Sequence, residues 1–252
     1  MVLLNRYRLV ITDIAQPKPG TPPLRRPGVL RFSAVELLVA LTLLFVVSPF
    51  VEDLKNGDII EAVLMSIVLA SAVLAVGASR RTLIVASLLL LPALLGKWIN
   101  HFRPDLLPPH AFLLAGGVFL VFIVIHLLRF ILRAPRVNSE VLCAAISVYL
   151  LLGLLWVLAY LLVAQINPDA FAFTAGPASK HTMNGFTAFY FSFATMTTVG
   201  YGDIIPVSNE ARMLAVMQAV TGMFYVAILI SRLVALYSAP TQALASPPEN
   251  RR

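Results

Sequence analysis

Residues 195–203, with the sequence TMTTVGYGD, carry the groups best suited to bind an ion. A dehydrated potassium ion must be held by oxygen atoms that replace its water shell, and a row of backbone carbonyls supplies such atoms. Consecutive carbonyls point the same way only if the handedness of the backbone alternates, and glycine permits positive φ at little cost. One chain cannot surround an ion, so four copies would each donate one position to every oxygen ring. The ion-binding residues predicted here are Thr198 (carbonyl and hydroxyl), Val199, Gly200, Tyr201 and Gly202.

Neighbouring side chains are expected to hold the diameter of this segment. Tyr201 and two aromatic residues of the preceding run, Tyr190 and Phe191, would pack outside the carbonyl rings, and we place Thr197 with them. Asp203 lies just beyond, where its carboxylate can hydrogen-bond the preceding helix and attract cations.

A short apolar run must position the TVGYGD segment. Residues 186–197 (FTAFYFSFATMT) are too few to cross a membrane, which predicts a re-entrant helix with Asn184 as its N-cap. Such a helix would aim its negative C-terminal end at the ion pathway. The irregular backbone that follows is tolerated at membrane depth only if protein buries it or it lines a water-filled path.

The rest of the chain is built from long apolar runs. Of the 252 residues, 59 % are hydrophobic and 12 % charged, which excludes a soluble enzyme. Each run has about 17–25 residues, the length that crosses a hydrocarbon core. Buried helices of a large soluble protein are the alternative, but six runs leave no polar scaffold to bury them, and Pro92 predicts a kink in the third. The six runs cover 32–51, 59–78, 82–99, 111–132, 141–164 and 213–237.

Basic residues indicate the orientation of these spans. With six spans they gather on one side, which is therefore cytoplasmic together with both termini, in a plasma or bacterial inner membrane. The net charge of +7 comes without a dense basic patch, so we expect no nucleic-acid partner. The Pro-rich tail 1–30 would either bind anionic inner-leaflet lipid or be disordered, and the tail 239–252 is short. The basic residues on this side are Arg6, Arg8, Lys18, Arg25, Arg26, Arg31, Arg80, Arg81, Arg129, Arg133, Arg136, Arg232, Arg251 and Arg252.

TVGYGD after a short aromatic helix and before a last spanning helix resembles the tetrameric potassium channel superfamily, over about 140–238. The resemblance implies a homotetramer that conducts K+ without a cofactor. It places Gly222 where an inner helix can bend, although a small residue for helix packing is the alternative. It also implies a cavity and gate formed by Met223, Val226, Ile230 and Val234. Some bacterial relatives carry a pore-helix glutamate, and Ala194 occupies that position here.

The six-span layout resembles voltage-gated channels, but the fourth span departs from theirs. Residues 111–125 contain no charge, and Arg129 and Arg133 lie at the cytoplasmic end, where they cross little of the field. We expect Glu36 to pair with one of these arginines as a structural contact. The sequence therefore predicts a degenerate four-helix voltage-sensor-like domain (31–137) and a pore domain (138–238).

The predicted fold class is an all-α polytopic membrane protein with six transmembrane helices, a re-entrant pore helix and a filter loop. The predicted function is passive, potassium-selective permeation with little or no voltage dependence; a genuinely voltage-gated channel is the alternative. An uptake transporter would need four pore repeats, and an enzyme would need a nucleophile–base or metal cluster, which the scattered histidines do not form. Gln218 and Thr221 are expected to bond neighbouring helices rather than ions, and His181 is a weak candidate for a proton sensor.

Overall fold

The computed structural model describes residues 33–51, 54, 57–76, 80–102, 108–175 and 181–237. The predicted tails 1–30 and 239–252 lie outside these residues. Six helices are long and apolar enough to cross a membrane, which confirms an all-α integral membrane protein with six candidate spans. They are α2 (Ser33–Val51), α3 (Gly57–Val76), α4 (Arg80–Phe102), α5 (Pro109–Arg133), α6 (Ser139–Ile166) and α8 (Asn209–Tyr237).

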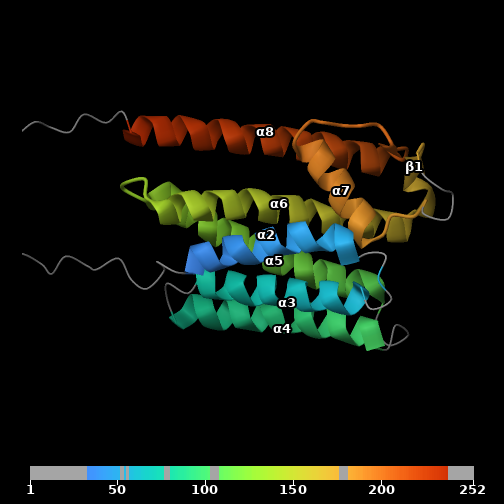
Figure 1. Ribbon diagram of the computed structural model, residues 1–252, viewed down its shortest axis with the longest axis horizontal. Coiled ribbons are helices and arrows are strands. Elements are labelled where there is room, and N and C mark those ends of the chain that lie inside the picture. Colours follow the sequence, from blue (N-terminus) through green and yellow to red (C-terminus); the bar gives the residue numbers. More distant parts are fainter. Residues whose placement is uncertain are drawn as a thin grey trace, which may run out of the picture.

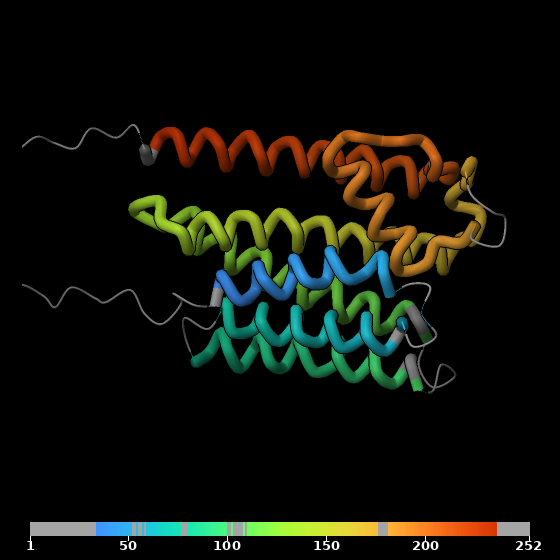
Figure 2. The backbone as a smooth tube through the Cα atoms, in the orientation of Figure 1, coloured from blue at the N-terminus to red at the C-terminus, as the bar shows by residue number. Residues whose placement is uncertain are grey.

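Helices α2 to α5 form a bundle that packs against α6 of the same chain (Figure 1). The five residues between α5 and α6 keep the two helices adjacent and antiparallel. Helix α8 lies beyond α6, and a shorter helix, α7 (Gly185–Met196), is wedged between them at one end. The start of α2 and the end of α8 lie at the opposite end of the molecule from α7 (Figures 1 and 2).

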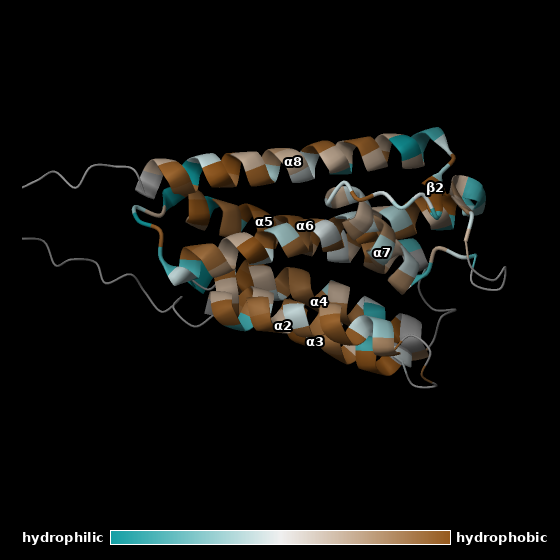
Figure 3. Ribbon diagram, turned by 45° about the horizontal axis from the view of Figure 1, so that its top comes forward, coloured by the Kyte–Doolittle hydropathy of each residue, from teal (hydrophilic) through white to brown (hydrophobic). Residues whose placement is uncertain are grey.

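Hydrophobic residues predominate along the spanning helices in Figure 3. Leu37, Leu41 and Phe119 are fully buried between helices, whereas Phe50 and Leu88 are 75 % and 66 % exposed. This exposure is the expected distribution for helices whose outer faces contact lipid tails. Helix α4 continues through Pro92 as one element.

The connection between α6 and α7 contains more structure than the polar loop that its composition predicts. A 3₁₀ turn (Pro168–Ala170) leads into β1 (Phe171–Phe173), which pairs antiparallel with β2 (Ile204–Pro206) beyond the TVGYGD segment. The backbone from the end of α7 returns to β2 as an extended segment (Figure 2). The two-stranded ribbon formed by β1 and β2 therefore joins the C-terminal end of α6 to the start of α8.

The predicted pairing of Glu36 with Arg129 or Arg133 is wrong. Glu36 lies on the exposed face of α2, and both arginines are exposed on α5. Within the described residues, the ion pair that forms instead joins Glu61 of α3 to Lys97 of α4. The reason is the register of α2, whose buried stripe contains Leu37 and Leu41 and leaves Glu36 on the exposed side.

Candidate functional site

Helix α7 begins with a capping box at the predicted N-cap. The Asn184 side chain accepts a hydrogen bond from the Thr187 amide at 2.8 Å, and the Asn184 amide donates to the Thr187 hydroxyl at 2.7 Å. The capping box thereby satisfies the amides of Asn184 and Thr187, which have no acceptor inside the helix. The 12-residue helix then ends at Met196 and delivers the chain to residues 197–202.

The backbone of this segment alternates in handedness. Thr198, Gly200 and Gly202 have φ of 60°, 53° and 79°, and these are the positive-φ residues of the described chain. The intervening Val199 and Tyr201 keep negative φ. This alternation is the condition for successive carbonyls to share one direction. The sequence predicted the two glycines, but not Thr198, because a β-branched residue rarely adopts this conformation.

Hydrogen bonds tie the amides of the segment to the end of α7. The Ala194 carbonyl accepts from the amides of Val199 and Gly200 at 3.0 and 3.1 Å, and the Thr195 carbonyl accepts from Thr198 at 3.0 Å. Within the described part of the chain, no hydrogen bond reaches the carbonyls of residues 198–201. These oxygens are therefore left available to a ligand.

The far end of the segment is held by the β1 side of the ribbon. The Thr174 hydroxyl donates to the Gly202 carbonyl at 3.0 Å, and the Thr174 amide donates to the Asp203 carbonyl at 2.8 Å. At the near end, the Thr197 hydroxyl donates to the Phe193 carbonyl at 2.7 Å, which places Thr197 in the closing turn of α7. Sequence reasoning missed Thr174 because its role depends on a strand pairing across 28 residues.

Tyr201 stacks against Tyr190 of α7, with ring centroids 6.1 Å apart and planes 10° apart. Tyr190 also hydrogen-bonds Asp203; desolvation, this hydrogen bond and the negative charge of Asp203 raise the pKa of Tyr190 to about 12. The phenol therefore remains a protonated donor at neutral pH. Asp203 in turn accepts from the Ile204 amide at 3.0 Å.

Phe191 occupies a different place from the one predicted. Its buried ring contacts Tyr160 of α6 at 4.8 Å and Phe171 of β1 at 5.6 Å between centroids. Phe191 therefore fixes α7 against α6 and β1, on the side of the helix away from Tyr190. Residues one apart on a helix point about 100° apart, so the two aromatics cannot share one face.

A buried polar network joins α6, α7 and α8 behind the segment. Gln218 donates through Nε2 to the Ser192 carbonyl at 2.9 Å and to the Ser192 hydroxyl at 2.7 Å, while its Oε1 accepts from the Tyr160 hydroxyl. The Ser192 hydroxyl donates to the Gly153 carbonyl at 2.8 Å. The expectation that Gln218 bonds neighbouring helices is confirmed. For Thr221 it is wrong, because that hydroxyl bonds the Met217 carbonyl of its own helix at 2.7 Å.

Gly222 touches the end of α7. A Cβ atom at Gly222 would lie 2.8 Å from the Met196 carbonyl oxygen, so only glycine allows this approach. Beyond it, one stripe of α8 is uncovered by the rest of the chain. Its members are Met223, Val226, Ile230 and Val234, with exposures of 63 %, 40 %, 55 % and 57 %.

Residues 197–202 also lie on an uncovered side of the single chain; Val199 is 53 % exposed and Tyr201 73 %. On one side, residues 197–202 are thus supported by α7 and the buried network. On the other side, no part of the described chain covers them. An apolar, glycine-punctuated segment of this kind needs further protein or an ion path in front of it at membrane depth.

Comparison with known proteins finds a family match over the region that contains the candidate site. The family model described as "Ion channel" matches residues 150–239, which run from within α6 through α8. The voltage-gated potassium channel Kch of Escherichia coli is 58 % identical over 36 residues, 14 % of this chain and 9 % of the relative. The inward rectifier potassium channel Kirbac3.1 of Paramagnetospirillum magnetotacticum is 36 % identical over 96 residues, 38 % of this chain and 29 % of the relative.

The calcium-gated potassium channel TvoK of Thermoplasma volcanium is 54 % identical over 39 residues, 16 % of this chain and 11 % of the relative. The chain thus spans less than a third of the length of each of these relatives. The family matched over these residues is one of ion channels, not of enzymes. No solved structure matches the chain.

Proposed function

We propose that four copies of this chain form a potassium-selective pore, since residues 150–239 match the ion channel family model. K+ would pass down the shared axis through oxygen rings contributed by Thr198, Val199, Gly200 and Tyr201, with Gly202 closing the filter. The relatives described above are named as potassium channels.

The observation that carries the proposal is the alternating backbone at Thr198, Gly200 and Gly202 together with the unused carbonyls of residues 198–201. Oxygen rings of this kind replace the hydration shell of a potassium ion. The contacts among Tyr190, Tyr201 and Asp203 would hold the diameter of the rings from outside, and Thr197 would support the start of the segment.

The uncovered surfaces support a homotetramer. Copies arranged around an axis would enclose the filter segment and the exposed stripe of α8. In that assembly Met223 and Val226 would line a cavity below Thr198, and Ile230 or Val234 would form a gate that closes by dewetting. Gly222 would serve as the packing contact to α7 and as a hinge for the inner helix.

The α2–α5 bundle would act as a voltage-sensor-like domain (31–137) with little sensitivity to voltage, attached to the pore domain (138–238). Arg129 and Arg133 lie in the last two turns of α5 and are exposed, without an acidic partner among the described residues. Charges so near an interface cross little of the field. The end of the molecule that carries the start of α2 and the end of α8 would face the cytoplasm, in a plasma or bacterial inner membrane.

Flux through purified protein in vesicles tests this function. Wild-type vesicles should take up K+ in strong preference to Na+, and Gly200→Ala should abolish the selective flux because residue 200 needs a positive φ. Gly117→Ala is the matched control, since a Cβ at Gly117 meets nothing within 4 Å. Equal K+ flux in Gly200→Ala and wild type would exclude the proposed filter.

A further inference from the structure

A cavity of about 330 Å³ lies between the α2–α5 bundle and the α6–α7 pair, away from the proposed ion path. Its volume is at the lower end of the range for small-molecule sites. Helices α2 to α7 all contribute to its lining. A ligand in this cavity would therefore touch the bundle and α7 at once.

The lining is graded from polar to apolar along the helix axes. Near the end of the molecule that carries the start of α7, the lining includes Ser48, Glu61, Lys97 and Gln165. One or two turns further in, the same four helices contribute Leu44, Leu69, Ala93 and Leu158. The apolar part is about 12 Å deep, measured as the eight residues from Glu61 to Leu69 at the helical rise.

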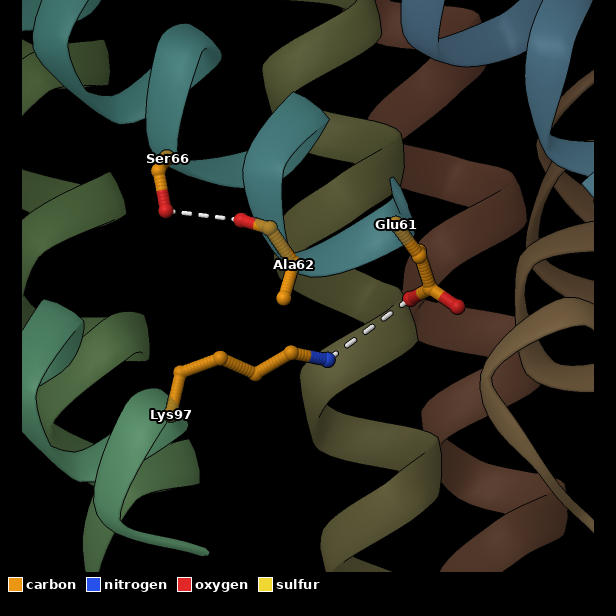
Figure 4. Close-up of polar contacts among 4 residues, drawn as sticks. All are labelled: Glu61, Ala62, Ser66 and Lys97. Carbon is orange, nitrogen blue, oxygen red and sulfur yellow. Dashed lines mark hydrogen bonds and ion pairs between the residues drawn. The ribbon is translucent and has the colours of Figure 1, made fainter. Parts of the chain in front are cut away.

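At the polar end of the cavity, the ammonium group of Lys97 has hydrogen-bond donors that Glu61 does not use. Its Nζ lies 3.7 Å from Glu61 Oε1, and both side chains are 34 % exposed. Figure 4 draws this ion pair between α3 and α4. That distance is longer than the 2.7–2.9 Å typical of a charge-assisted hydrogen bond. No hydrogen bond of Lys97 to another described residue is found. Its ammonium carries three donors, so it can bind a second anion.

Glu61 has another favourable neighbour besides Lys97. A Cβ atom at Gly185, the first residue of α7, would lie 3.4 Å from Glu61 Oε1 and 3.6 Å from Oε2. The carboxylate thus lies at the N-terminal end of α7, where the helix dipole favours negative charge. Lys97 can therefore turn to another carboxylate while Glu61 keeps a stabilising environment.

We propose that this cavity binds a single-chain amphiphile with a carboxylate head, of the fatty-acid type. The carboxylate would pair with Lys97, and the alkyl chain would run inward between Leu44, Met65 and Leu158. This orientation places the head near the membrane interface and the chain at hydrocarbon depth, as in the surrounding bilayer. The site is separate from the filter, and binding to it does not depend on ion conduction.

Photolabelling of the full-length protein in nanodiscs tests the site. The probe is decanoic acid bearing a diazirine on its chain, and labelled residues are identified by mass spectrometry. We expect labels on cavity residues such as Met65 and Leu158, displaced by unmodified decanoate and much less by decanol, which lacks the charge. Labels confined to lipid-facing residues such as Ile67, or not displaced by decanoate, would overturn the proposal.

Two substitutions separate the head from the chain. Lys97→Met should weaken decanoate binding about tenfold, the loss of one charge-assisted contact, whereas Lys97→Arg and the distant Arg81→Met should not. Met65→Trp should fill the cavity and block labelling. Ile67 lies on the outer face of the same helix and is 48 % exposed, so Ile67→Trp should leave labelling unchanged.

Glu61→Gln distinguishes decanoate binding by Lys97 from a purely structural role of the Glu61–Lys97 ion pair. Removing the competing carboxylate frees Lys97, so decanoate should bind more tightly although a native ion pair is lost. Gel filtration and thermal unfolding identify variants that misfold. If Met65→Trp does not fold, Lys97→Arg and Glu61→Gln still test the site, because they preserve side-chain size. Equal decanoate affinity in wild type, Lys97→Met and Glu61→Gln would refute the site.

Discussion

Gln218 of α8 donates to Ser192 of α7 twice, to its carbonyl at 2.9 Å and to its hydroxyl at 2.7 Å. Both side chains are fully buried, and Tyr160 of α6 completes the network by donating to Gln218. In a low-dielectric interior such contacts are costly to leave half made. The network therefore fixes α8 to α7 at one register.

Gln218→Leu should destabilise the protein by about 1–3 kcal/mol, because it leaves the Tyr160 hydroxyl buried without its acceptor. Thermal unfolding in detergent measures the effect. Thr221→Val is the control, since that exposed hydroxyl bonds only its own helix and its loss should cost less than about 0.5 kcal/mol. Equal stability of the two variants would contradict the role of the network.

Gly222→Ala should destabilise the contact between α8 and α7 by about 1–3 kcal/mol, because its Cβ would meet the Met196 carbonyl oxygen at 2.8 Å. Thermal unfolding of Gly222→Ala and Gly117→Ala measures this cost. If Gly222 acts as a hinge alone, the two variants will unfold at the same temperature and differ only in channel opening.

Tyr190→Phe should lower the preference for K+ over Na+ without preventing insertion, because it removes the hydrogen bond to Asp203 but keeps the stacking on Tyr201. The pKa of Tyr190, about 12, lies above the ordinary tyrosine value of 10.0, so the folded state favours the protonated phenol. Its stabilising hydrogen bond is fully present below pH 10 and is lost as the pH rises through about 12.

Between about pH 6 and 9 the difference in selectivity between wild type and Tyr190→Phe should therefore be constant. The measurement is the permeability ratio at several pH values. A difference that vanishes at pH 9 would show that another group controls this contact.

The open probability should depend weakly on voltage. Arg129 and Arg133 lie at one end of α5, so we expect less than about one gating charge per subunit. Conductance–voltage curves of wild type and of Arg129→Gln, Arg133→Gln should superimpose, with surface expression as the control. Several gating charges per subunit in the wild type would establish the voltage-gated alternative.

The sequence predicted the parts of the fold that have a local cause. Apolar runs defined six spans because each must match the bilayer by itself, and Asn184 was recognisable as a cap from its position before the aromatic run. Gly200 and Gly202 were predicted as positive-φ residues from their lack of a Cβ atom. Gln218 was identified as a helix-bonding residue because an amide in an apolar span needs a partner.

Features that depend on distant partners could not be predicted. Thr198 adopts a positive φ because α7 holds its amide, and β1 forms because β2, which follows the TVGYGD segment, pairs with it. Phe191 was placed beside Tyr201, but the rotation of α7 turns it toward Tyr160. The Glu61–Lys97 pair joins residues 36 apart, and no local pattern selects it over the predicted partner of Glu36.

The reversal potential of purified wild-type protein in a bilayer, with K+ on one side and Na+ on the other, tests the central claim most directly. Selective oxygen rings at residues 198–201 predict a reversal potential close to the potassium equilibrium potential, lost in Gly200→Ala and kept in Gly117→Ala. A reversal potential near zero in the wild type would contradict a potassium-selective filter.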